Sequence, residues 1–214
     1  MICVSIANKT FEECKEISHS MEFAEIRLDT MQLTPEEIKK LFLGHKKLIA
    51  TCRPGKHNDE QRLMMLSTAI DAGAAFVDIE LESEDDYRKM LVKKAHEKEC
   101  EVIISYHDYD GTLPKEELEE IVSGCFRLGA DVAKIACKVK TEKDNARLFG
   151  LLDSDRKLVV IGIGEHGKIT RIVAPMLGSQ FTFAVLKKGE ETADGQMTIE
   201  EMEKLSRILG GHND

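Results

Sequence analysis

The chain has 214 residues, of which 42% are hydrophobic and 32% are charged, with only 4 prolines and 15 glycines. This composition is typical of a globular protein and excludes the disordered and collagen-like classes. The net charge of −9 argues against a nucleic-acid-binding surface, which needs a basic stripe. An anionic small molecule stays compatible with this charge, because a few cations in one cleft can outweigh the overall sign.

The apolar runs and the cysteines indicate where the protein works. No apolar run approaches the roughly 18 residues of a membrane helix, and the first residues lack the basic stretch of a signal peptide. No two of the six cysteines are spaced as C-x-x-C, so we expect reduced core cysteines rather than a zinc site or a redox pair. A cytoplasmic protein without membrane contact is therefore the expectation.

Short apolar runs alternate with longer amphipathic segments along the chain. The expected strands are residues 2–6, 24–28, 47–52, 76–81, 101–106, 132–137, 158–163 and 181–185. The expected helices are residues 11–21, 35–43, 60–72, 84–99, 115–128, 142–152, 168–177 and 199–209. Strand–helix units repeated in this way predict a compact, single (β/α)8 TIM barrel domain over residues 1–214. The alternative is a doubly wound open sheet.

A hydroxyl residue followed three positions later by a carboxylate marks several helix starts. In such a capping box the hydroxyl accepts a hydrogen bond from an unpaired backbone N–H, and the carboxylate favours the positive end of the helix. The predicted boxes begin at Thr10, Thr34, Ser83, Thr141 and Thr198.

Charged residues share one face of several expected strands. Ile26 and Leu28 lie on one face of their strand, and Glu25 and Arg27 lie on the other. The outer face of a parallel barrel packs against helices and is apolar, so the charged face points inward. The expected inward set is Glu25, Arg27, Arg53, Asp78, Glu80, His107 and Lys134. Buried charges cost several kcal/mol each unless they are paired, which favours a catalytic role. The alternative is an internal salt-bridge layer that only fixes the fold.

Lys134 and His107, on adjacent expected strands, suggest a particular chemistry. An exposed lysine is protonated at pH 7, but desolvation and neighbouring cations favour the neutral amine. A neutral buried amine forms an imine with a ketone or an aldehyde, and a histidine can take and return a proton. Together the two residues predict imine-assisted proton abstraction next to a carbonyl carbon. The alternatives are that Lys134 pairs with Glu80 or Asp78, and that His107 is only structural.

Six short motifs follow one another along the chain and resemble a known family. They are Glu25-Ile26-Arg27, Thr51-Cys52-Arg53-Pro54, Ser105-Tyr106-His107-Asp108, Ala130-Asp131-Val132-Ala133-Lys134-Ile135-Ala136, Thr170-Arg171 and Asp194-Gly195-Gln196. In this order they resemble the type I 3-dehydroquinases, which are Schiff-base lyases of the shikimate pathway. The resemblance implies dehydration of 3-dehydroquinate to 3-dehydroshikimate by syn loss of water, with no metal and no cofactor.

The resemblance also implies roles for individual residues. Lys134 would form the imine, His107 would act as general acid and base, and Arg171 would bind the substrate carboxylate. Thr192 and Gln196 would lie on a lid after the last strand. The ring hydroxyls would be held by Ser5, Glu25, Arg27 and Arg53.

One position departs from the family pattern. The family usually carries a glutamate shortly after the arginine that corresponds to Arg53, and this glutamate pairs with the catalytic histidine. This chain has His57 at that position. A histidine cannot stabilise an imidazolium as a carboxylate does. The candidates for supporting His107 are therefore Asp78, Asp59, Glu60 and His57 itself.

Two rival functions and the assembly state complete the expectations. A class I aldolase-like barrel also uses a lysine imine, but it needs a phosphate site after strands seven and eight, where this chain has Arg171 and Gln196. A non-enzymatic binding or scaffold barrel would form no imine. Because the last helix has an apolar face and dimers are common among such barrels, we expect a homodimer.

Overall fold

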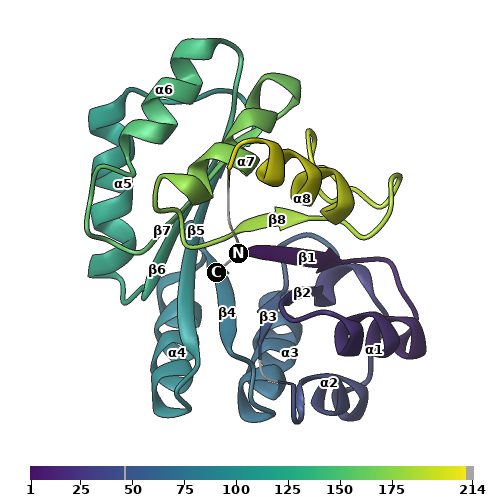
Figure 1. Ribbon diagram of the computed structural model, residues 1–214. Helices are drawn as coiled ribbons and strands as arrows, with labels where there is room; N and C mark the ends of the chain where they lie inside the picture. The colour runs from purple at the N-terminus through teal and green to yellow at the C-terminus, as the bar shows by residue number, and fades with distance from the viewer. Residues whose placement is uncertain (46, 211–214) are drawn as a thin grey trace. The chain divides into compact units, whose positions relative to one another are not determined.

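The computed structural model describes residues 1–45 and 47–210, in which strands and helices alternate (Figure 1). The strands are β1 (Ile2–Ile6), β2 (Ala24–Arg27), β3 (Leu48–Thr51), β4 (Phe76–Glu80), β5 (Glu101–Asp108), β6 (Val132–Lys138), β7 (Leu158–Ile163) and β8 (Thr182–Ala184). The helices are α1 (Phe11–Ser20), α2 (Pro35–Phe42), α3 (Asp59–Asp71), α4 (Asp85–Glu97), α5 (Lys115–Arg127), α6 (Glu142–Gly150), α7 (Lys168–Met176) and α8 (Ile199–Ile208). Two short 3-10 helices, η1 (Leu28–Thr30) and η2 (Glu165–Gly167), follow β2 and β7.

The strand order confirms the predicted fold class. The described strands form one eight-stranded sheet in the order β7-β6-β5-β4-β3-β2-β1-β8. Neighbours in the sheet are neighbours in the chain, except that β8 pairs in parallel with β1. This is the order of a (β/α)8 barrel, whereas a doubly wound sheet reverses its order part-way. The open-sheet alternative is wrong.

Helix starts mostly follow the capping prediction. Capping boxes close at Thr10, Thr34, Thr141 and Thr198, and a fifth, which the prediction missed, closes at Asn58. The box predicted at Ser83 is wrong. The Arg88 guanidinium binds the carbonyl oxygens of Leu81 and Ser83, at 2.9 and 2.6 Å, and α4 begins only after Glu84.

The chain divides into two compact units, which we describe separately. The N-terminal unit comprises Ser5–Ile104 and Leu128–Asp131, and the C-terminal unit comprises Met1–Val4, Ser105–Arg127 and Val132–Asp214. Among the described residues of both units, no helix is long and apolar enough to cross a membrane.

In the N-terminal unit, strand register separates charged from apolar side chains. Ile26 lies opposite Ala50, and Ala50 lies opposite Val77, so these buried apolar residues share one face of the sheet. Arg27 lies opposite Thr51, and Thr51 lies opposite Asp78, on the other face. Burying a Val, Leu or Ile side chain contributes about 1.5–3 kcal/mol, so the apolar face fixes the register and thereby the position of the charged face.

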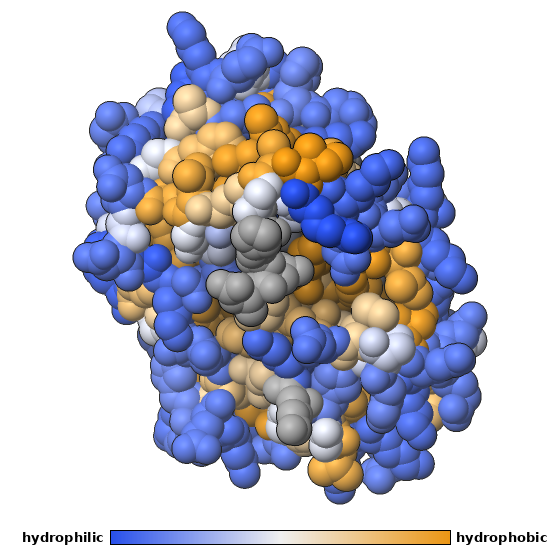
Figure 2. All heavy atoms as spheres, in the orientation of Figure 1, coloured by the Kyte–Doolittle hydropathy of each residue, from blue (hydrophilic) through white to orange (hydrophobic). Residues whose placement is uncertain are grey.

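In the C-terminal unit, an apolar cluster joins α7, β8 and α8. Ile172, Ala184 and Met202 form this cluster, and Ile2, Met197 and Ile199 pack against it. Figure 2 shows hydrophobic residues gathered in the upper half of the face drawn. Several hydrophobic side chains at the ends of α7 and α8 stay exposed. They include Met176 and Leu177 at the end of α7, and Ile208 and Leu209 at the end of α8.

A glycine-rich turn, residues 162–167, leads from β7 into α7. The Thr170 hydroxyl accepts a hydrogen bond from the N–H of Gly162 and donates one to the carbonyl of Gly167, both at 2.7 Å. A Cβ at Gly167 would lie 2.4 Å from the carbonyl carbon of Gly162. The glycines of this G-x-G-x-x-G stretch therefore allow two backbone segments to touch.

This contact gives a prediction for stability. Gly167→Ala should lower the free energy of unfolding by about 1–3 kcal/mol, as overpacking does, because backbone atoms have to move apart. Chemical denaturation measures the change. Gly111→Ala is the control, since a Cβ at Gly111 meets nothing within 4 Å. Equal stability of the two variants would contradict the prediction.

Candidate active site

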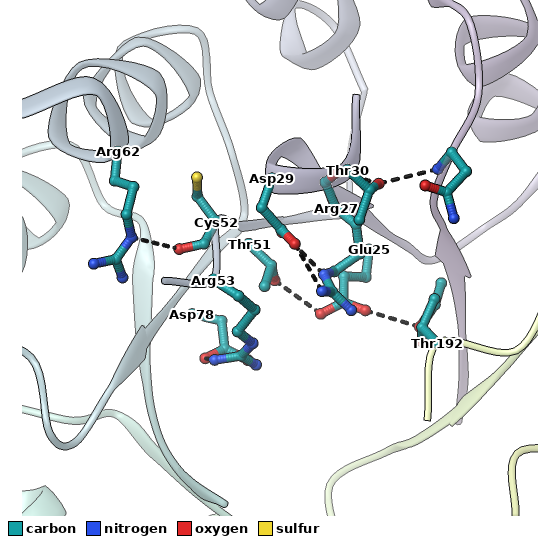
Figure 3. Close-up of polar contacts among 12 residues, drawn as sticks. Glu25, Arg27, Asp29, Thr30, Thr51, Cys52, Arg53, Arg62, Asp78 and Thr192 are labelled. Carbon is teal, nitrogen blue, oxygen red and sulfur yellow. Dashed lines mark hydrogen bonds and ion pairs between the residues drawn. The ribbon is translucent and has the colours of Figure 1, made fainter. Parts of the chain in front are cut away.

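Glu25 is held by two hydroxyls in the N-terminal unit (Figure 3). Ser5 Oγ donates to Glu25 Oε2 and Thr51 Oγ1 donates to Glu25 Oε1, both at 2.8 Å. All three residues are buried. The carboxylate is thus fixed by neutral donors, on the face of the sheet that carries the other charged residues.

Two arginines of the same unit bind carboxylates. Arg27 Nε and Nη2 donate to the two oxygens of Asp29, at 3.0 and 2.8 Å. Arg53 donates to both oxygens of Asp78, at 2.8 and 3.1 Å, and to Glu80 at 2.6 Å. Bidentate pairs of this kind are the strongest and most directional ion pairs that proteins make.

The pKa values of both arginines follow from this pairing. Burial by itself would lower the pKa of Arg27, but the hydrogen bond to Asp29 and the charge of Glu25 raise it. Burial would likewise lower the pKa of Arg53, and the charges of Asp78 and Glu80 outweigh it and raise that pKa. Both guanidinium groups therefore stay charged across the physiological pH range.

The segment after β3, which consists of a loop and the start of α3, carries three of the candidates for supporting His107. Asp59 begins α3 and binds Arg62 at 2.8 Å, while Glu60 follows it and is exposed. Arg62 also donates from Nε to the carbonyl of Cys52, at 3.1 Å. His57 Nε2 is buried and has no hydrogen-bond partner among the described residues.

In the C-terminal unit, Lys134 lies in the middle of β6. The residue is only 5% exposed, and its Nζ lies 4.4 Å from the centroid of the Phe183 ring on β8. His107 lies near the end of β5, which neighbours β6 in the sheet. Its ring is nearly parallel to that of Tyr109, with centroids 6.1 Å apart. The predicted imine lysine is thus a buried amine beside an aromatic ring.

Arg171, in the first half of α7, is a buried cation whose guanidinium is only partly hydrogen-bonded. It is 1% exposed, and Nη1 donates to the carbonyl of Phe183 at 3.3 Å. Nε and Nη2 are buried and have no hydrogen-bond partner among the described residues. Burial lowers the pKa of Arg171 to about 10, although the charge of Asp194 acts in the opposite direction. A planar anion would satisfy the two remaining donors.

Thr192 and Gln196 lie on the loop between β8 and α8. Gln196 Oε1 accepts hydrogen bonds from the N–H and the hydroxyl of Thr192, at 2.8 and 3.0 Å. The backbone N–H of Gly164, after β7, donates to the carbonyl of Asp194 in the same loop, at 2.9 Å. The loop is therefore bonded both within itself and to the turn that follows β7.

Sequence reasoning missed three residues of these networks. Asp29 lies in η1, two residues beyond Arg27, and Thr51 belongs to one of the recognised motifs, so the sequence offered a signal for both. Phe183 gave no such signal. Its contact with Lys134 depends on how β6 and β8 are arranged in space, which the pattern along either strand does not reveal.

Burial makes several cysteines of the chain poor nucleophiles. All six are buried and none forms a disulfide, and burial raises the pKa of the Cys52 and Cys137 thiols to about 12. Thiolate chemistry at these two residues is therefore negligible near neutral pH. In the part of the chain that the structure describes, no group of three His, Cys, Asp or Glu side chains is arranged to bind a metal ion.

The eight described strands, in their order in the sheet and alternating with helices, define a protein of the (β/α)8-barrel class. A family model described as Type I 3-dehydroquinase matches residues 2–213, and the chain belongs to that family.

Relatives and solved structures agree with this family. The chain is 36% identical to a 3-dehydroquinate dehydratase of Methanocaldococcus jannaschii, an alignment that covers 98% of this chain and 99% of the relative. Its fold resembles the crystal structure of 3-dehydroquinate dehydratase from Geobacillus kaustophilus. The TM-score is 0.86 at 23% sequence identity, and the match covers 100% of this chain and 92% of that chain. It also resembles the crystal structure of a type I 3-dehydroquinate dehydratase from Clostridium difficile with covalently modified comenic acid. The TM-score is 0.84 at 27% sequence identity, and the match covers 97% of this chain and 91% of that chain.

The two buried nitrogen atoms of Arg171 that lack a partner among the described residues give a prediction for stability. Arg171→Met should raise the free energy of unfolding at pH 7 by about 1–3 kcal/mol, because a buried donor without a partner is removed. The penalty is fully present below pH 10 and shrinks as pH rises from the folded-state pKa of about 10 toward the ordinary value of 12.5.

Urea denaturation at pH 7 measures this change. Arg147→Met is the control, because the partly exposed Arg147 is paired with Asp144 at 2.7 Å and should gain nothing on replacement. A loss of stability in Arg171→Met would show that the arginine is satisfied in the free protein.

Proposed function

We propose that this protein is a lyase that dehydrates 3-dehydroquinate to 3-dehydroshikimate, a step of the shikimate pathway of aromatic amino-acid biosynthesis. The family match over residues 2–213 supports the activity and supports treating residues 1–214 as one catalytic barrel domain. The observation that carries the mechanism is the burial of Lys134 in the middle of β6. Lysine is among the residues least often buried in proteins, so a lysine in the interior of a strand calls for a specific role.

The first step joins enzyme and substrate. The neutral amine of Lys134 attacks the C3 carbonyl of dehydroquinate, forming a carbinolamine that loses water to give a protonated imine. The imine withdraws electrons from the adjacent carbon and acidifies its C2 proton. The covalent adduct in the Clostridium difficile relative is compatible with such chemistry.

His107 then moves the protons. Its imidazole takes the C2 proton, and the electron pair of the C–H bond forms an enamine. The enamine expels the C1 hydroxyl, which receives a proton from His107 and leaves as water on the same face. Water hydrolyses the remaining imine, which releases 3-dehydroshikimate and restores the amine of Lys134.

The substrate carboxylate is assigned to Arg171, whose Nε and Nη2 supply two parallel donors. Thr192 and Gln196 are assigned to the lid over the substrate. The ring hydroxyls are assigned to Ser5, Glu25, Arg27 and Arg53, which are the polar residues that match the family positions.

Which residue supports His107 stays a prediction, with Asp78, Asp59, Glu60 and His57 as its candidates. Arg53 binds Asp78 and Arg62 binds Asp59, so both carboxylates already neutralise a cation. The pH–rate profile of His57→Glu, which restores the usual family residue, tests whether a carboxylate at this position strengthens the base.

The rival aldolase function is disfavoured by the loops after β7 and β8. Barrel enzymes that bind phosphorylated substrates hold the phosphate on backbone N–H groups in these loops. In this chain the N–H of Gly164 donates to Asp194, whose carboxylate would also repel a phosphate. A rate of dehydroquinate dehydration far above that of sugar-phosphate cleavage would exclude the rival.

A cytoplasmic homodimer is proposed as the working form. Six buried thiols suit a reducing compartment, and the exposed apolar ends of α7 and α8 offer a surface for a second copy. Light scattering during size-exclusion chromatography tests the dimer, and a monomeric mass would exclude it.

The imine gives the decisive prediction. Borohydride added with dehydroquinate should leave a reduced adduct on Lys134, and mass spectrometry of a digest should locate it. Lys134→Met should lose both the adduct and at least a thousandfold of the rate, because the electron sink is gone. Lys138→Met, on the same strand, is the control and should keep the adduct on Lys134. An adduct on another residue would exclude the mechanism proposed for Lys134. No adduct at all would favour the alternative of a non-enzymatic binding or scaffold barrel.

The role of His107 gives a separate prediction. His107→Ala should lower kcat by about 100- to 10,000-fold, the usual contribution of general acid–base catalysis, while borohydride still traps some imine. Steady-state assays and trapping measure the two effects on one sample. Unchanged turnover in His107→Ala would remove the residue from the mechanism.

A further inference from the structure

The β8–α8 loop, residues 185–198, is tied down at its base. Val185 donates its N–H to the carbonyl of Met197 at 3.0 Å, and Ile199 donates to the carbonyl of Val185 at 2.9 Å. Between these ends, residues 191–197 line an open depression of about 920 Å3 that is also lined by Lys204 and Leu205 of α8. The loop is thus poorly packed on its α8 side, and its position depends on contacts elsewhere.

Those contacts are made to the ends of β6 and β7. Lys138 Nζ lies 2.7 Å from Asp194 Oδ2, and the N–H of Gly164 donates to the carbonyl of Asp194 at 2.9 Å. Lys138 is the last residue of β6 and lies opposite Ile163, the last residue of β7. Side chain and backbone of Asp194 are therefore both held by neighbouring strand ends.

Two glycines make this approach possible. Gly164 has a φ of +93°, and a Cβ there would lie 2.9 Å from Lys138 Nζ. Gly195 has a φ of +78°, and a Cβ there would lie 2.4 Å from the carbonyl oxygen of Gly164. A larger residue at Gly195 would clash with the backbone of Gly164 and separate the loop from the strand ends, and one at Gly164 would displace the Lys138 side chain. We call Lys138, Gly164, Asp194 and Gly195 the clasp.

The clasp also fixes the position of the negatively charged Asp194 carboxylate beside Lys138. The hydrogen bond from Lys138 and its charge lower the pKa of Asp194, so the carboxylate is ionised at neutral pH. The Asp194 charge also acts on Arg171, where it opposes the effect of burial. Arg171 has two buried nitrogen atoms without a hydrogen-bond partner among the described residues, so an Asp194 carboxylate released from Lys138 would find donors there.

We propose that Lys138 is a positioning residue for the dehydration: through the clasp it holds the loop that carries Thr192 and Gln196, and it keeps the Asp194 carboxylate away from Arg171. This inference rests on the proposed function for the roles of those three residues. Lys138 and Asp194 are 33% and 60% exposed, so their pair has the strength of a surface ion pair, and its effect should appear in substrate affinity rather than in folding.

Steady-state kinetics of a small set of variants tests the proposal. Asp194→Asn should raise KM about two- to fivefold, the range of a surface ion pair, with kcat changed less than twofold. Lys138→Met should raise KM further, to about tenfold, because the unpaired Asp194 then competes for Arg171. Adding Asp194→Asn to Lys138→Met should lower KM again, to the value of Asp194→Asn alone. Lys138→Arg should restore KM to within twofold of the wild-type value.

Glu165→Gln is the matched control. It removes the ion pair between Lys168 and Glu165, at 2.8 Å, on the neighbouring turn, and KM should not change. Trypsin cleavage after Lys187 and Lys188 reports the loop itself and should accelerate in Lys138→Met and Asp194→Asn but not in the control.

The outcomes separate the clasp from the proposed function. An unchanged KM with a lower melting temperature and lower kcat would mean that the clasp is only structural, and unchanged KM and cleavage would also overturn the proposal. A double variant worse than Lys138→Met alone would exclude the competition with Arg171. If the wild-type protein traps no imine with dehydroquinate, the proposed function fails, whereas the cleavage rates still decide whether the clasp holds the loop.

Discussion

The burial of charged side chains is the constraint on which this structure depends. A guanidinium or carboxylate removed from water is tolerated only when partners replace its lost hydration. Arg53 meets this requirement with Asp78 and Glu80, Arg27 with Asp29, and Glu25 with two hydroxyls. These residues share one face of the N-terminal unit because the opposite face is apolar. The register that buries Ile26 and Ala50 is therefore also the register that aligns the charges.

Arg171 departs from this rule in an informative way. Its guanidinium is as deeply buried as any in the molecule, yet two of its nitrogen atoms have no partner in the described residues. A site that is complete without ligand gains little from binding one, whereas an incomplete site gains the hydrogen bonds that the ligand supplies. The departure thus lies where the family resemblance assigns the substrate carboxylate, and under the function we propose it would exchange stability for affinity.

Much of the fold could be predicted from the sequence because its local signals agree with one another. Alternating strand and helix patterns, four of the five proposed capping boxes and the strand parity all indicated the architecture that is observed. In the N-terminal unit, parity also identified the face of the sheet on which Arg27 and Asp78 lie. It could not identify partners, since the Lys138–Asp194 pair joins residues 56 positions apart and depends on loop conformation. Ser83 failed as a cap for a similar reason: the side chain of Arg88, one turn later, binds its carbonyl.

The backbone contact between Gly164 and Gly195 has an evolutionary consequence. Surface loops usually accept insertions and deletions freely, because each loop changes shape without disturbing the others. Here the turn after β7 and the loop after β8 touch through backbone atoms, so an insertion or deletion beside the contact in either segment would break it. We would therefore expect changes of length in these two segments to be inherited together across the family. The two loops form one unit of variation, although they are separated along the chain by a helix and a strand.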